Sequence, residues 1–175
     1  MMGVMRRTFL LEQLEAELAT SLVVLRAVPA DALDWKPHPQ SFTLGRLAMH
    51  VAAIPGWTHA FIDADVYDMG AGGPGPATPA SCGDIMATFD ASASRARQAL
   101  SGVEESALAD VWTLVRDGAP IATMSRAEAI ARYAIRHTVH HRGQLCVYLR
   151  LLNVPVPPLY GDSADMRVLP REFTS

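Results

Sequence analysis

The chain has 175 residues, the length of one domain with a single hydrophobic core, so we expect residues 1–175 to form one domain. Half of the residues are hydrophobic, 19% are charged and the formal net charge is −3. These values exclude a disordered chain and argue against a basic surface that binds nucleic acid.

The first predicted helix spans about residues 6–28. Its leucines recur every three or four positions, as on one buried helical face: Leu10, Leu11, Leu14, Leu18, Leu22 and Leu25. Pro29 ends this pattern, and the prolines within 29–40 predict an extended connector. We expect Trp35, which lies in this connector, to close one end of the core.

A second helix is predicted from an N-cap at Ser41 or Thr43 to about Asp65. Proline lacks a backbone N–H and crowds the carbonyl four residues earlier, so we expect a kink at Pro55. The stretch 70–79 is rich in glycine and proline and predicts a flexible loop. It lacks the Lys-Ser/Thr pair of a phosphate-binding loop.

A third helix is predicted over about Asp84–Leu100. Its inward positions are Ile85, Phe89, Ala93 and Leu100, and its outward positions include Arg95 and Arg97. The following segments 111–115 and 121–124 could form a short β-hairpin around the Asp117-Gly118 turn.

The fourth predicted helix begins at a capping box from Ser125 to Glu128 and continues without interruption to about Leu152. The remaining chain contains four prolines, so we expect it to pack across one end of the bundle. Four amphipathic helices predict an all-α fold, a four-helix bundle, with a possible short hairpin between the third and fourth helices.

Three of the six histidines are predicted to face the core together. With about 100° per residue, His137 and His141 lie on one inward face of the fourth helix, and His50 faces inward on the second. A buried imidazole needs a partner for each ring nitrogen. Two histidines at i and i+4 and a third from a facing helix can bind one metal ion and leave a position open.

Packing is the simpler alternative for each histidine taken alone. The HxxxH pattern arises often by chance, and a single core histidine is usually a hydrogen-bonded packing residue. The joint inward placement of all three favours a metal. His140 lies at the flank of this face, and His38 and His59 are predicted to be at the surface.

The two cysteines are too few for a disulfide framework or a CxxC metal site. Cys146 lies on the helical face opposite the histidines and is predicted to be a packing residue. Cys82 has no evident base nearby that would activate it as a nucleophile. Acidic residues interrupt the N-terminal apolar run, and no stretch approaches the roughly 20 apolar residues of a membrane span. We therefore expect a soluble, cytoplasmic protein.

Three runs of this sequence together resemble the DinB family: LGRLAMH at 44–50, HTVHHRGQL at 137–145 and VPPLYGDSAD at 156–165. The resemblance covers nearly the whole chain. It implies a four-helix bundle with a divalent metal held by His50, His137 and His141, and it implies frequent homodimers. Imidazole ligands do not distinguish Zn, Ni or Fe.

The resemblance also implies a class of reaction. Characterised relatives in the wider superfamily are metal-dependent transferases or isomerases that use low-molecular-weight thiols such as mycothiol or bacillithiol. We therefore expect a metal-dependent thiol S-transferase or hydrolase acting on a small molecule, with a metal-bound water or thiol as the reacting group.

Three further residues could support this site: His140, Arg142 and Gln144. Gln144 is predicted to face inward, where it would contact a ligand or merely satisfy a buried carbonyl, and Arg142 could equally form a salt bridge between helices. The alternative to an enzyme is a dimeric helical module that binds a metal or a small hydrophobic ligand in a stress response.

Overall fold

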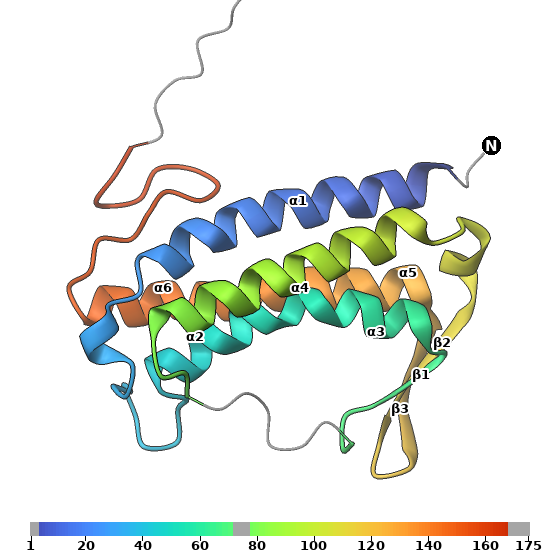
Figure 1. The fold of residues 1–175 in the computed structure, drawn as a ribbon, viewed down its shortest axis with the longest axis horizontal. Coiled ribbons are helices and arrows are strands. Elements are labelled where there is room, and N and C mark those ends of the chain that lie inside the picture. The colour runs from blue at the N-terminus through green and yellow to red at the C-terminus, as the bar shows by residue number, and fades with distance from the viewer. Residues whose placement is uncertain (1–3, 72–77, 168–175) are drawn as a thin grey trace, which may run out of the picture.

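The structure is a computed structural model that describes residues 4–71 and 78–167. Four long helical segments lie side by side along the molecule (Figure 1). They are α1 (Val4–Arg26), the bent segment α2–η2–α3 (Leu44–Asp63), α4 (Cys82–Gly102) and the run α5–η4–α6 (Arg126–Leu151). In the bundle, α1 contacts α4 and α6, while α2 contacts the same two helices. The predicted bundle is confirmed.

The second helical segment bends where the sequence predicts. It consists of α2 (Leu44–Ala53), the 3-10 turn η2 (Ile54–Gly56) and α3 (Trp57–Asp63), so Pro55 lies in the tightened turn. Thr43 is the N-cap of α2, and its side chain accepts a hydrogen bond from the Arg46 backbone N–H. The helix ends two residues before the predicted Asp65.

The third long helix, α4, begins slightly earlier than predicted. Ser81 and Asp84 form a reciprocal capping box, and the helix continues to Gly102. Its predicted inward residues Ile85, Phe89 and Leu100 are all buried. This agreement confirms the helical face that was inferred from the apolar spacing.

The fourth segment is not the continuous α-helix that the sequence predicts. It starts at the Ser125 N-cap with α5 (Arg126–Ala129), passes through a π-helical stretch, η4 (Ile130–Arg136), and becomes regular in α6 (His137–Leu151). A π turn closes i→i+5 hydrogen bonds and rotates the following residues relative to a regular helix. His137 and His141 both follow it, so their mutual spacing is still that of an α-helix.

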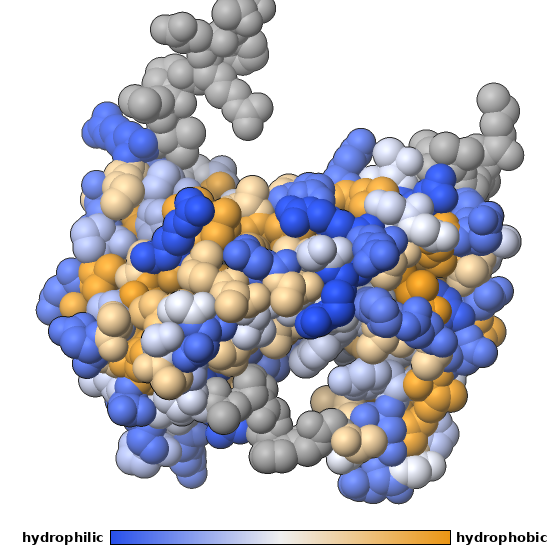
Figure 2. All heavy atoms as spheres, viewed as in Figure 1, coloured by the Kyte–Doolittle hydropathy of each residue, from blue (hydrophilic) through white to orange (hydrophobic). Residues whose placement is uncertain are grey.

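The fold is not all-α, because a three-stranded sheet joins the bundle. β2 (Val111–Arg116) and β3 (Ala119–Ser125) form the predicted antiparallel hairpin, and Asp117 and Gly118 in its turn have positive φ angles. β1 (Val66–Asp68) pairs in parallel with β2 and was not predicted. Figure 2 shows the sheet projecting from one end of the bundle as a separate lobe.

The connector and the tail close the opposite end of the bundle. The connector contains the 3-10 turn η1 (Ala30–Ala32), and Trp35 is half-buried with its ring edge-on to Tyr148, as predicted for a residue that closes the core. In the tail, Pro157 is buried and Asp165 pairs with Arg150 at 2.5 Å.

Two sequence predictions fall partly outside the described residues: most of the loop 70–79 and the end of the tail, beyond residue 167. Among the helices that the structure describes, none is long and apolar enough to cross a membrane.

Candidate metal centre

Three histidines from two facing helices meet inside the bundle. Nε2 of His137 lies 2.7 Å from Nε2 of His141, one turn further along α6. His50, in the last turn of α2, places its ring centroid 4.4 Å from that of His141. One potential ligand atom from each of the three residues lies within 4.8 Å of the other two. The predicted convergence of His50, His137 and His141 is therefore present.

Aromatic side chains enclose this histidine cluster. The Trp57 ring lies 5.6 Å from the His50 ring and 5.3 Å from the His137 ring, between centroids, and Phe42 lies 6.1 Å from His50. Trp57 in turn stands against Tyr67 of β1, so the sheet supports this aromatic wall from outside. The wall limits the rotamers of the imidazoles and excludes water from one side of the cluster.

Burial keeps the imidazoles neutral. Burial, the largest cause, and the charges of the neighbouring histidines together lower the pKa of His50 to about 4 and that of His137 to about 4. The pKa of His141 is also lowered by burial, although the hydrogen bond to Gln144 opposes the shift. Neutral imidazoles are the metal-binding form, so at neutral pH a cation would not compete with protons here.

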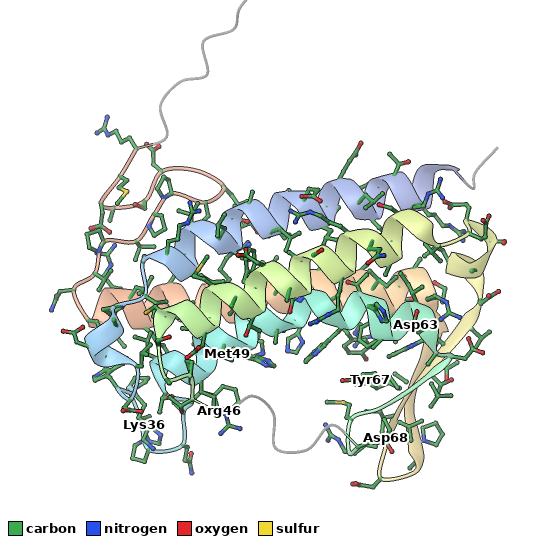
Figure 3. The ribbon with its side chains drawn as sticks, in the orientation of Figure 1. Lys36, Arg46, Met49, Asp63, Tyr67 and Asp68 are labelled. Carbon is green, nitrogen blue, oxygen red and sulfur yellow. The ribbon has the colours of Figure 1, made fainter. Side chains whose placement is uncertain are left out.

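A cation also accompanies the cluster on α2. The Arg46 guanidinium lies over the Phe42 ring, 4.4 Å from its centroid, and contributes to the lowered pKa of His50. Figure 3 shows the Arg46 side chain extending from α2 on the side away from α4. Arg46 therefore helps to keep the His50 imidazole neutral.

Gln144 links two of the neighbouring histidines. Its Oε1 lies 2.8 Å from Nδ1 of His141, and its Nε2 lies 3.2 Å from Nε2 of His140. Because an amide oxygen only accepts, His141 donates its Nδ1–H, which leaves the Nε2 lone pair directed at His137. Gln144 lies on the histidine face of α6, as predicted, but it is exposed and contacts His141 rather than a buried carbonyl.

Arg142 takes no part in the histidine cluster. Its side chain is 1% exposed, and it donates at 2.6 Å to the Glu17 carboxylate of α1, whose side chain is 12% exposed. It also donates to the hydroxyls of Thr20 and Ser21 on α1 and to that of Tyr160 in the tail. Of its two predicted roles, the salt bridge between helices is the one the structure contains.

The hydrogen bonding of the cluster fits a metal ion better than it fits protons alone. If His137 donates its Nε2–H to His141, its buried Nδ1 lacks a donor among the described residues. If Nδ1 instead carries the proton, toward the Tyr133 carbonyl, two Nε2 lone pairs face each other at 2.7 Å. A cation between the two nitrogens removes both conflicts. The buried Nδ1 of His50 likewise has no hydrogen-bond partner within the described part of the chain.

The remaining histidines and the cysteines lie apart from the cluster. His38 and His59 are exposed, as predicted, and His59 pairs with Asp63 at 2.9 Å. Cys82 is half-buried and donates to the Val28 carbonyl at 3.4 Å. Burial raises the pKa of both Cys82 and Cys146, so neither thiol is an activated nucleophile.

Helical periodicity places Trp57 on the face of His50, but it did not predict that aromatic rings enclose the site. Trp57 lies seven residues after His50, which places it on the same side of a helix two turns later. That spacing was the available signal for Trp57. Phe42 precedes the helix, so no helical period could place it.

A sequence model of the DinB family matches residues 4–170. The chain belongs to the DinB family. Two solved structures share its fold, a DinB-like protein from Bacillus cereus and one from Bacillus subtilis. The first is 21% identical, with a TM-score of 0.66, and the match covers 86% of this chain and 95% of the other. The second is 15% identical, with a TM-score of 0.65 over 86% and 96% of the two chains.

A search among curated proteins found no match to this DinB-family chain. At these identities the two solved structures establish the fold alone. The chemistry of this DinB protein must be argued from its own histidine cluster.

Proposed function

We propose that this DinB-family protein binds one divalent metal ion through His50, His137 and His141 and is a metal-dependent enzyme, a transferase that uses a low-molecular-weight thiol. The observation that carries this proposal is the set of three neutral imidazoles whose ligand atoms lie within 4.8 Å of one another. Within the described residues, no cysteine or carboxylate joins that group.

Three histidine ligands suit a reactive site better than a structural one. Structural zinc sites are usually closed by four protein ligands, whereas catalytic sites keep a position for water or substrate. When bound, the metal would supply Lewis acidity, lowering the pKa of a coordinated thiol or water. Zn, Ni and Fe all accept imidazole ligands, so the proposal extends to each.

The surrounding residues of the chain would prepare the site for this chemistry. Gln144 holds His141 in the tautomer whose Nε2 is free to bind, and ligand orientation of this kind contributes to metal affinity. Trp57 packs on two of the imidazoles and shields them from water. Arg46 adds to the effect of burial that lowers the pKa of His50 and keeps this imidazole in its metal-binding form.

A thiol-transfer assay tests the enzymatic part of the proposal. The protein loaded separately with Zn, Ni and Fe is incubated with 1-chloro-2,4-dinitrobenzene and, in turn, cysteine, glutathione, bacillithiol and mycothiol. We expect turnover with at least one thiol and its loss in His137→Ala. Metal binding without turnover for any thiol and any metal would contradict the transferase and leave a metal-binding module.

We also propose that the protein forms a homodimer, as expected for its family. Size-exclusion chromatography with light scattering should give the mass of two chains. The mass of one chain would refute the dimer without affecting the proposed metal centre.

A further inference from the structure

A cavity of about 430 Å³ opens directly beside the histidine cluster. It lies between the end of the connector and one face of α6, and His141 is part of its wall. The other lining residues are Gln40, Ser41, Phe42, Leu47, Gln144, Val147 and Tyr148. Its volume falls within the range of sites that hold small molecules.

The lining has the chemistry of a site for an uncharged molecule. Among the described residues that line the cavity there is no Asp, Glu, Lys or Arg. Phe42, Leu47, Val147 and Tyr148 present apolar surface, while Gln40 and Ser41 add an amide and a hydroxyl at one side. A charged group would find no partner of opposite charge among these lining residues.

The walls of the cavity are fixed to one another before any ligand binds. The Tyr148 hydroxyl donates to the Phe42 carbonyl at 3.3 Å, which ties α6 to the connector. Trp35 supports the Tyr148 ring edge-on, at 5.7 Å between centroids. A cavity with fixed walls costs less ordering entropy when a ligand enters.

Two residues make the cavity continuous with the candidate metal centre. His141 belongs to both, and the Phe42 ring that lines the cavity also stands 6.1 Å from the His50 ring. A molecule whose reacting end lies at the three histidines can therefore extend its remaining atoms between Phe42 and Val147.

We propose that this cavity receives the uncharged, largely apolar part of the substrate while the reacting end of the same molecule lies at the histidine cluster. The proposal rests on the proposed function, because it assumes that the reaction takes place at His50, His137 and His141. The substrate is then a small molecule with an aromatic or aliphatic body. Specificity is determined by Phe42, Val147 and Tyr148.

The test uses two probe thiols that differ in their apolar part. The full chain is loaded with Co²⁺, and benzyl mercaptan or 2-mercaptoethanol is titrated while the sulfur-to-cobalt charge-transfer absorbance is followed. We expect benzyl mercaptan to bind at least about tenfold more tightly, because its ring leaves water and enters the cavity. Equal affinities would overturn the proposal.

A matched pair of variants tests whether the preference for benzyl mercaptan over 2-mercaptoethanol arises in the cavity. Val147→Trp fills the cavity from α6, where the valine is 57% exposed, and Val23→Trp makes the same change at a 46% exposed site on α1. We expect Val147→Trp to lose the preference while retaining its cobalt, and Val23→Trp to keep both. A preference that survives in Val147→Trp would contradict the assignment.

Failure of the metal centre is distinguished from failure of the cavity. If the wild-type protein takes up no Co²⁺, the proposed function fails, and the cavity is then tested in the metal-free protein with benzyl alcohol. Backbone amide NMR shifts confined to residues 40–47 and 141–148, and absent in Val147→Trp, would support the cavity. Shifts elsewhere, or no shifts at millimolar benzyl alcohol, would overturn it.

Discussion

Replacing Arg142 by methionine should destabilise the fold far more than the same change at Arg97. Both arginines pair at 2.6 Å with a glutamate on α1, and the two glutamates, Glu17 and Glu15, are only two positions apart. The difference lies in burial. The side chains of the Arg142 pair are 1% and 12% exposed, whereas those of the Arg97 pair are 47% and 48% exposed.

The expected magnitudes follow from this difference. Removing one partner of a buried ion pair costs about 3–5 kcal/mol, because the remaining charge is left without compensation. Arg142→Met also removes the donor to Thr20 and Ser21. An exposed pair contributes about 0–1 kcal/mol. For a chain of this size, about 2–4 °C in Tm accompanies each kcal/mol, so we expect Arg142→Met to lower Tm by about 6–20 °C.

Urea unfolding followed by far-ultraviolet circular dichroism measures these free energies for Arg142→Met and Arg97→Met. The double variant Glu17→Gln/Arg142→Met should recover part of the loss, because it no longer leaves a buried carboxylate unpaired. Equal destabilisation by the two single variants would refute the reasoning. So would an Arg142→Met variant that loses less than about 1 kcal/mol, the range expected of an exposed pair.

Three further predictions concern the histidines and the thiols. The folded-state pKa of His50 and of His137 is about 4, below the ordinary 6.5, so the unfolded chain binds more protons between these values. The free energy of unfolding of the metal-free protein should therefore fall as pH decreases from about 6.5 toward 4. The fall should be smaller in a His50→Gln/His137→Gln variant, and an equal fall in the two proteins would contradict the prediction. Gln144→Ala should weaken Zn²⁺ affinity by about 10–100-fold in a competition titration with a chromogenic chelator, because His141 loses the partner that orients it; unchanged affinity would exclude that role. Cys82 and Cys146 should react with Ellman's reagent more slowly in the native protein than in urea, since burial raises the pKa of both thiols; equal rates would show that neither is protected.

The convergence of the histidines could be predicted because it depends on local periodicity. His137 and His141 are one turn apart whatever surrounds them, and His50 lies among apolar residues on its helix. The π-helical stretch η4, just before His137, changes the rotation of α6 relative to α5. It leaves the spacing of His137 and His141 within α6 unchanged.

The features that sequence reasoning missed depend on contacts between distant segments. β1 has three residues, too few for a period, and it exists because Val66–Asp68 pairs with a strand more than 40 residues later. Arg142 follows His141 directly, and the sequence could not decide whether it supports the cluster or reaches α1. The cavity wall combines connector residues with α6, so no single helical pattern could reveal it.

The central claim is that His50, His137 and His141 together bind one metal ion, and metal stoichiometry tests it most directly. The wild-type protein and single alanine variants at these positions are equilibrated with Zn²⁺, desalted and analysed by mass spectrometry for metal per chain. His59→Ala is the matched control, because His59 is exposed and paired with Asp63 away from the cluster.

We predict close to one zinc per chain in the wild type and in His59→Ala, and a large loss in each of the three cluster variants. His140→Ala should also retain its zinc, since His140 contacts the cluster only from its flank. A wild-type protein without zinc, or loss of zinc in His140→Ala but not in His141→Ala, would contradict the assignment.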